Sequence, residues 1–127
     1  MPTKITLKAG DHTLAGVLND SETAQALVKR LPLKFSLSRW GEEYYGGIGK
    51  SLGVPEATEA RDLMRVGELA FWIPGNAFCI FFGPTPASTG QEPRAASNVN
   101  PVGQLEGEYL NVLRKPGGTI TMIIEKA

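Results

Sequence analysis

The 127-residue sequence is poor in the residues on which much enzyme chemistry depends. It has a single histidine, His12, and a single cysteine, Cys79. These counts exclude an internal disulfide bond and a zinc site with two or more histidine or cysteine ligands. A Ser/His/Asp or Cys/His centre would have to be built around His12, whose place beside a predicted turn favours a surface residue. Cys79 lies in an apolar segment, which predicts a buried, unreactive thiol.

Net charge and long hydrophobic runs are also lacking. Thirteen basic residues balance thirteen acidic ones, so there is no electrostatic reason to expect nucleic acid or an anionic membrane as a partner. The longest apolar run, Ala77–Phe82, is too short to cross a bilayer. Met1–Lys8 alternates charged and apolar residues, unlike a signal peptide. We therefore expect a cytoplasmic protein with no metal and no cofactor, which binds neither nucleic acid nor membrane.

What the sequence has in excess is turn-forming residues, with 15 glycines and 9 prolines. This content favours a β-rich fold with many reversals. The hydrophobic share of 42% is enough to form a buried core. Because the length is typical of one compact unit, we expect a single domain spanning residues 1–127.

Several segments have the period-two alternation of a β-strand, most clearly Thr3–Ala9 and Leu33–Arg39. Two fully apolar segments, Leu69–Ile73 and Ala77–Phe82, flank Pro74-Gly75-Asn76, which suits a chain reversal. The other predicted strands are His12–Leu18, Tyr44–Ile48, Gly103–Glu106, Asn111–Arg114 and Thr119–Lys126, with a hairpin turn at 115–118 joining the last two.

One amphipathic helix is predicted over about 21–30. Ala24, Leu27, Val28 and Leu31 follow the spacing of a single buried stripe, and Pro32 ends the pattern. Seven or eight short strands with one helix indicate a mainly β fold, namely a closed barrel of about eight strands with the helix plugging one end. Residues 83–101 are rich in proline, glycine, serine and asparagine, which predicts a long loop inserted in this domain.

The first candidate site residue is Arg39, at the end of an alternating strand, where its guanidinium should emerge at a rim of the barrel. Such an arginine either binds a ligand carbonyl or carboxylate, or forms an ion pair with Glu42, Glu43 or Glu68. Glu42 and Glu43 are neighbours, and neighbours in an extended segment point to opposite faces. We therefore expect them to be solvated charges and not a catalytic carboxylate pair.

Aromatic and amide side chains supply the other candidates. The aromatic residues either form the walls of a site near Arg39 or belong to the core; they are Trp40, Tyr44, Tyr45, Trp72 and Phe82. Asn98 and Asn100 flank Val99 in the predicted loop. Their amides either bind a ligand or brace the loop through backbone hydrogen bonds.

At this point the order of elements resembles the cyclophilin fold: two strands, a helix, a strand bearing an arginine, then a central glycine-led apolar pair. Val102-Gly103-Gln104-Leu105-Glu106-Gly107 is similar to the segment that follows the cyclophilin active-site loop. Residues 67–77 and 81–86 more closely resemble a small prokaryotic family of cyclophilin-like domain proteins of largely unknown function. The resemblance covers most of the chain and is weak at 49–65.

The resemblance implies a closed barrel of about eight strands with a groove on its outer face. In cyclophilins an arginine polarises the prolyl amide there, and Arg39 is the best match to it, with Phe81 or Phe82 matching a pocket phenylalanine. The sequence departs from that pattern, because F-S-L-S-R-W-G replaces F-H-R-I-I-P and Tyr45 replaces the glutamine before paired glycines. Residues 83–101 contain no histidine or tryptophan where the pocket residues would lie.

The sequence therefore predicts a cyclophilin-like barrel that binds a small molecule or peptide in a groove near Arg39 and the 83–101 loop. The predicted ligand-binding residues are Arg39, Tyr44, Trp72, Phe82, Asn98 and Asn100. One alternative is a peptidyl-prolyl isomerase in which Arg39 is the catalytic residue. The other is an oligomeric interaction module, a homo-oligomer whose 83–101 loop packs on a neighbouring subunit.

Overall fold

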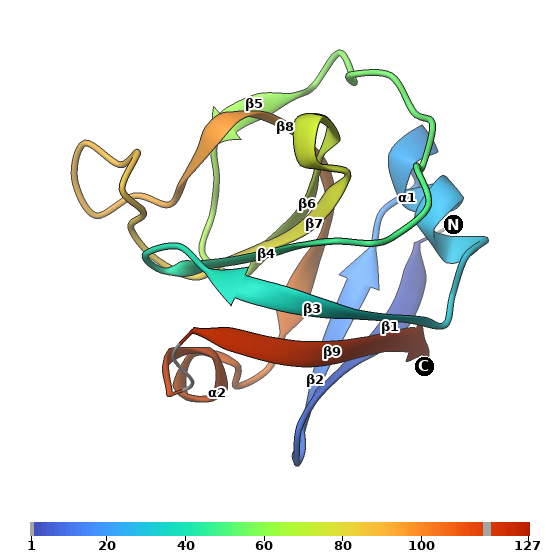
Figure 1. Ribbon diagram of the computed structural model, residues 1–127, viewed down its shortest axis with the longest axis horizontal. Helices are drawn as coiled ribbons and strands as arrows, with labels where there is room; N and C mark the ends of the chain where they lie inside the picture. The colour runs from blue at the N-terminus through green and yellow to red at the C-terminus, as the bar shows by residue number, and fades with distance from the viewer. Residues whose placement is uncertain (1, 116–117) are drawn as a thin grey trace.

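The computed structural model describes residues 2–115 and 118–127 and shows a β-barrel with short helices beside it (Figure 1). The strands are β1 (Thr3–Ala9), β2 (His12–Leu18), β3 (Leu33–Arg39), β4 (Glu43–Gly47), β5 (Arg61–Leu63), β6 (Glu68–Trp72), β7 (Ala77–Phe81), β8 (Arg94–Glu106) and β9 (Thr119–Lys126). The helices are α1 (Glu22–Val28), the 3₁₀ turn η1 (Ile73–Gly75) and α2 (Leu110–Arg114).

The strands form a closed barrel, as the sequence predicts. Their order is β2-β1-β9-β3-β4-β7-β6-β8, and β2 pairs with β8 to close the ring. Each of these pairings is antiparallel. At the closure, a Cβ on Gly103 would lie 2.2 Å from the carbonyl oxygen of Val17, so only glycine allows β8 and β2 to approach this closely.

Alternate side chains of the strands fill the barrel with one apolar core. Phe35 and Phe78 meet edge to face, and Tyr44 stacks on Phe82 with their centroids 5.6 Å apart. The predicted helix is confirmed as α1, whose Leu27 is buried against this core. It begins after Ser21, whose side chain accepts a hydrogen bond from the Ala24 amide, and it ends at Val28 and not Arg30.

The two described α-helices lie on opposite sides of the barrel (Figure 1). The predicted strand at Asn111–Arg114 is wrong, because this segment belongs to helix α2, which buries Leu113 against the barrel core. The turn predicted at 115–118 includes residues 116 and 117, which lie outside the described residues. Neither α1 nor α2 has the length and apolar character of a membrane span, and no other described helix does.

The largest correction concerns residues 83–101, whose second half is not a loop. Strand β8 begins at Arg94 and not at Gly103. Its first half pairs with β5, a strand that the sequence did not predict, and its second half pairs with β6 and β2. The register shifts beside Pro101, where a bulge accommodates a residue that cannot donate to the ladder.

Because β8 bends at this bulge, its first half and β5 leave the barrel wall and lie over the outer face of β6 and β7 (Figure 1). A second apolar cluster fills the space between them, outside the barrel. Its buried members are Met64, Ala70, Cys79, Phe81, Ala95 and Val99, with the partly buried Trp72 packed against them. The molecule therefore has two apolar layers, one inside the barrel and one on its outer wall.

Candidate functional site

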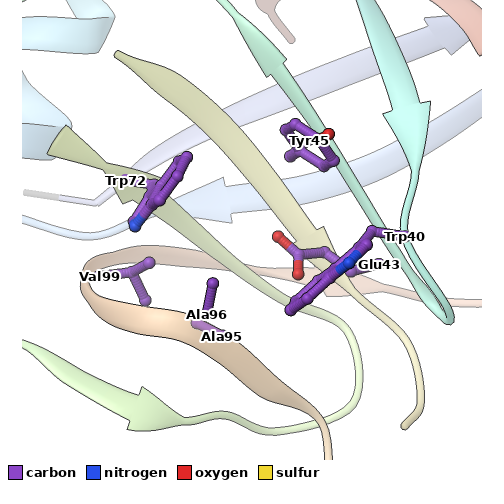
Figure 2. A pocket seen from close by; sticks show the side chains of 7 residues that line it. All are labelled: Trp40, Glu43, Tyr45, Trp72, Ala95, Ala96 and Val99. Atoms are coloured by element: carbon purple, nitrogen blue, oxygen red, sulfur yellow. The ribbon is translucent and has the colours of Figure 1, made fainter. Parts of the chain in front are cut away.

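A pocket of about 220 Å³ opens beside this outer cluster, between β4, β6 and the first half of β8. Figure 2 shows its lining, which is mostly aromatic and small apolar side chains around one carboxyl group. The lining residues are Trp40, Glu43, Tyr45, Trp72, Ala95, Ala96 and Val99. Tyr45 and Ala96 are exposed, so the pocket is accessible from solvent.

The alternation of β4 decides which of its side chains reach the pocket. Glu43 and Tyr45 point outward, while Tyr44 between them is fully buried in the barrel core. In the register of β4 and β7, Glu43 is opposite Phe81 and Tyr45 is opposite Cys79. Glu43 is therefore surrounded by the outer apolar cluster on its inner side and by the pocket on its open side.

Trp72, at the end of β6, forms the opposite wall. Its indole Nε1 donates a hydrogen bond of 2.7 Å to Ser97 Oγ on β8, which fixes the ring against that strand. The six-membered ring of Trp72 also packs on Gly75, where a Cβ would lie only 2.7 Å from two ring carbons. The position of this wall therefore depends on a serine on one side and a glycine on the other.

The most unusual group in the pocket is the Glu43 carboxyl, which is 5% exposed. Its Oε1 is buried and has no hydrogen-bond partner among residues 2–115 and 118–127. Burial raises the pKa of Glu43 from 4.5 to about 8, opposed in part by a hydrogen bond from the Cys79 thiol. At neutral pH the carboxyl is therefore mostly protonated, and it can donate a hydrogen bond as well as accept one.

The prediction that Glu43 is a solvated charge is wrong. Glu43 is the first residue of β4, and the first half of β8 covers the outward face of this part of the sheet. Cys79 is confirmed as a buried thiol. Its pKa is raised by burial and further by the neighbouring Glu43, so at neutral pH it is not a reactive thiolate. Within the described ranges, no three histidine, cysteine or acidic side chains form a metal-binding group.

Arg39 lies on the other face of the sheet, at an end of the barrel. It pairs with Tyr44 in the β3–β4 register, and its guanidinium lies over the rings of Tyr44 and Phe82, 5.9 and 5.2 Å from their centroids. Its Nε donates to the Gly41 carbonyl and its Nη1 to the Arg114 carbonyl. Arg39 also forms an ion pair with Glu42, which pairs in addition with Arg114 at 3.0 Å.

The other predicted site residues fall in three different environments. Tyr44 and Phe82 are in the barrel core beside Arg39, and Trp72 lines the outer pocket. Asn98 is exposed on β8.

Asn100 is buried, where it accepts from the Ala57 amide and donates to Thr23 Oγ1 and the Pro55 carbonyl. The structure thus brings Arg39, Tyr44 and Phe82 together and does not bring them to Trp72.

Sequence analysis missed most of the pocket. The predicted site residues do not include Glu43, Ala95, Ala96 or Val99. Trp40 and Tyr45 were considered only as aromatic walls near Arg39. The available signal was the alternation of Glu43 and Tyr45, which puts an acidic and an aromatic side chain on one face. Without the strand at Arg94–Val99, however, nothing in the sequence shows that this face is covered.

Comparison with known proteins agrees with the barrel topology. A family model described as Cyclophilin-like matches residues 3–124, so the chain belongs to the cyclophilin-like family. The solution structure of a hypothetical protein from Archaeoglobus fulgidus is similar to this chain, with a TM-score of 0.80 and 28% sequence identity. That similarity covers 98% of this chain and 95% of the archaeal one. No curated protein matches the sequence.

Proposed function

We propose that this cyclophilin-like barrel is a binding protein for a small, mostly apolar molecule or an apolar side chain of a peptide. The ligand would enter the pocket between Trp40 and Trp72, with a polar group facing Glu43. The observation that carries the proposal is the buried Oε1 of Glu43, which has no hydrogen-bond partner in the part of the chain that the structure describes. A buried polar atom without a hydrogen bond lowers the stability of the folded protein by about 1–3 kcal/mol. Such atoms are found at sites where a bound ligand supplies the missing hydrogen bond.

The size of the pocket limits the ligand. A volume of about 220 Å³ is below the roughly 300–1,000 Å³ of sites for drug-sized molecules, so the site accommodates about one ring with short substituents. In the barrel interior, the rings of Tyr44 and Phe82 are completely buried and stacked on each other, so they are core residues and not walls of this pocket. Binding at the outer pocket therefore requires no opening of the barrel.

Intrinsic fluorescence tests the proposal directly, because the chain has two tryptophans and both line the pocket. A panel of single-ring amides, alcohols, amines and short proline peptides is titrated while tryptophan emission is followed. We expect members of the panel to change the emission saturably and to compete with one another. Ala96→Phe places a ring in the pocket and should abolish the response.

Ala15→Phe is the matched control, because Ala15 is also a small exposed strand residue but lies on β2, away from the pocket. It should respond like the unmodified protein. If no compound gives a saturable change, or if Ala96→Phe binds as well as Ala15→Phe, the pocket is not the binding site.

The isomerase alternative is tested in the same protein with a protease-coupled prolyl isomerisation assay. The guanidinium of Arg39 donates to two backbone carbonyls and lies against buried rings, which supports a role in holding the barrel end. We therefore expect Arg39→Ala to lower stability and to leave ligand binding at the outer pocket unchanged. Isomerase activity that disappears in Arg39→Ala, at a temperature where the variant is folded, would favour the enzyme alternative.

The oligomer alternative depends on the 83–101 segment, of which residues 87–93 precede strand β8. Sedimentation of a chain lacking 87–93 tests it, because an unchanged number of subunits would exclude this part of the segment from assembly.

A further inference from the structure

We propose that the polar group of the ligand is a protonated amine: the pocket is a receptor for a small alkylammonium ion that donates an N–H hydrogen bond to Glu43 and packs its alkyl part between Trp40, Tyr45 and Trp72. This inference rests on the proposed function and specifies the chemistry of its ligand.

The first support is that other buried and half-buried acidic groups are paired with arginines. Glu42 pairs with Arg39 and Arg114, Glu68 pairs with Arg61, and Asp62 and Glu92 both pair with Arg94. Glu43 is the exception, because no salt bridge to it occurs among the described residues although it is the most buried of these five groups. A cationic ligand would pair with Glu43 in the way that arginines pair with the other four acidic groups.

The second support is the nature of the walls. Figure 2 shows the Glu43 carboxyl directed into the space between Trp40 and Trp72, with Tyr45 on a further side. The faces of indole and phenol rings carry negative potential and attract ammonium groups, most strongly where water is excluded. Three aromatic rings around one carboxyl group are therefore a better environment for an organic cation than for a neutral ring of the same shape.

Among the described residues that line the pocket with Glu43, none carries a positive charge that would compete with the ligand. Glu42, which precedes β4, is directed to the other side, where it pairs with Arg39 and Arg114, and on β7 the group that contacts the carboxyl is the Cys79 thiol. The pocket-lining residues of β8 are Ala95, Ala96 and Val99, and that of β6 is Trp72. Within the described lining, the other titratable group is the phenol of Tyr45.

The orphaned oxygen also indicates which amines fit. Oε1 requires a hydrogen-bond donor, so a primary, secondary or tertiary ammonium satisfies it and a quaternary ammonium does not. Binding an ammonium ion requires Glu43 to be ionised. Because burial raises the pKa of Glu43 to about 8, the affinity for a ligand that stays protonated should increase about tenfold for each unit by which the pH is raised toward that value.

Two commercial probes of matched shape test the inference, namely cyclohexylamine and cyclohexanol. The amine stays protonated up to about pH 10, as a lysine side chain does. Tryptophan emission is titrated with each probe between pH 6 and 9, in the unmodified protein and in Glu43→Gln and Glu42→Gln. We expect the amine to bind more tightly than the alcohol at pH 8.5, and its Kd to fall about tenfold per unit between pH 6 and 8.

Glu43→Gln should weaken amine binding by about tenfold or more at pH 8.5 and remove its pH dependence, while leaving binding of the alcohol within about threefold. Glu42→Gln has the same chemical change one residue away and should behave like the unmodified protein. A folded Glu43→Gln variant, checked by circular dichroism, that binds the amine unchanged overturns the inference.

Equal or tighter binding of cyclohexanol in the unmodified protein also overturns it, and in that case the proposed function stands with a neutral ligand. If neither probe binds, the alkylammonium inference is refuted, and the panel of neutral ring compounds decides separately whether the pocket binds any ligand.

Discussion

Replacing Glu43 by glutamine should stabilise the protein, and more so as the pH rises. Glutamine has nearly the shape of a protonated glutamic acid and never ionises. The Glu43 carboxyl has a folded-state pKa of about 8, raised from 4.5 by burial. Between these two values the unfolded chain gives up the proton and the folded protein keeps it. The contribution of Glu43 to stability is thus fully present below pH 4.5 and is lost as the pH rises to about 8.

The magnitude follows from the difference between the two pKa values. At about 1.4 kcal/mol per pH unit, the folded state loses about 3 kcal/mol relative to the unfolded state from pH 4.5 to 7, and about 5 kcal/mol by pH 8. Glu43→Gln removes this loss, so its free energy of unfolding relative to the unmodified protein should increase by those amounts over the same intervals. For a small domain of typical stability, about 3 kcal/mol is a large fraction of the total.

Urea denaturation followed by far-ultraviolet circular dichroism at pH 5, 6, 7, 8 and 9 measures this difference, because it does not depend on the tryptophans of the pocket. Glu42→Gln is the matched control. Glu42 pairs with two arginines on the other face, and these keep their charge throughout the range, so its difference from the unmodified protein should be small and constant. Parallel curves for Glu43→Gln and the unmodified protein would refute the reasoning, because they would mean that Glu43 is ionised in the folded state.

Three further substitutions test how the fold positions the pocket. Asn100→Ala should lower the free energy of unfolding by about 2–4 kcal/mol in urea denaturation, because it removes the three hydrogen bonds of a buried side chain, and a loss below about 1 kcal/mol would mean that these bonds do not hold the segment in place. Gly103→Ala should destabilise the barrel closure by about 2 kcal/mol or more, seen as a lower Tm, because its Cβ would overlap a β2 carbonyl. Gly75→Ala should displace the Trp72 ring, which weakens binding of any pocket ligand and shifts tryptophan emission, with little change in Tm; unchanged emission would mean that Gly75 does not position the ring.

The strands that were predicted with their correct bounds are those in which alternation reflects two neighbours on a regular ladder. Thr3–Ala9 pairs with β2 and β9 along its length, and Leu33–Arg39 pairs with β9 and, near its end, with β4. In both strands, one face contacts the barrel core and the other faces solvent. Apolar and polar residues therefore alternate along the sequence of each strand. The closed barrel could be predicted from these segments and from the resemblance of the central pair of apolar segments to the cyclophilin fold.

The segments that were missed owe their structure to distant partners. Asn111–Arg114 is too short for a helical period to show, and it is helical because Leu113 packs against the barrel core. Residues 94–101 have a composition typical of loops, since alanine, asparagine and proline are poor strand formers. They form a strand because β5 and β6 supply ladder partners, and neither partner could be assigned to them from sequence alone.

The missed first half of β8 also explains why the predicted site residues lie in different parts of the structure. Arg39 is visible in the sequence because it continues the inward alternation of β3, and it lies at an end of the barrel over the rings of Tyr44 and Phe82, which are in the barrel core. Glu43 faces the other way, and its chemistry depends on β8 crossing back over the barrel wall to exclude water from it.

The pocket lies between the barrel and the part of β8 that leaves it. Its lining residues can therefore be substituted, and its ligand changed, without disturbing the barrel core. The protein can therefore tolerate a buried acid there that costs stability at neutral pH. That cost is the physical reason to expect a ligand, because a partner for Glu43 lowers the free energy of the folded state and its buried Oε1 has no hydrogen-bond partner within the described residues.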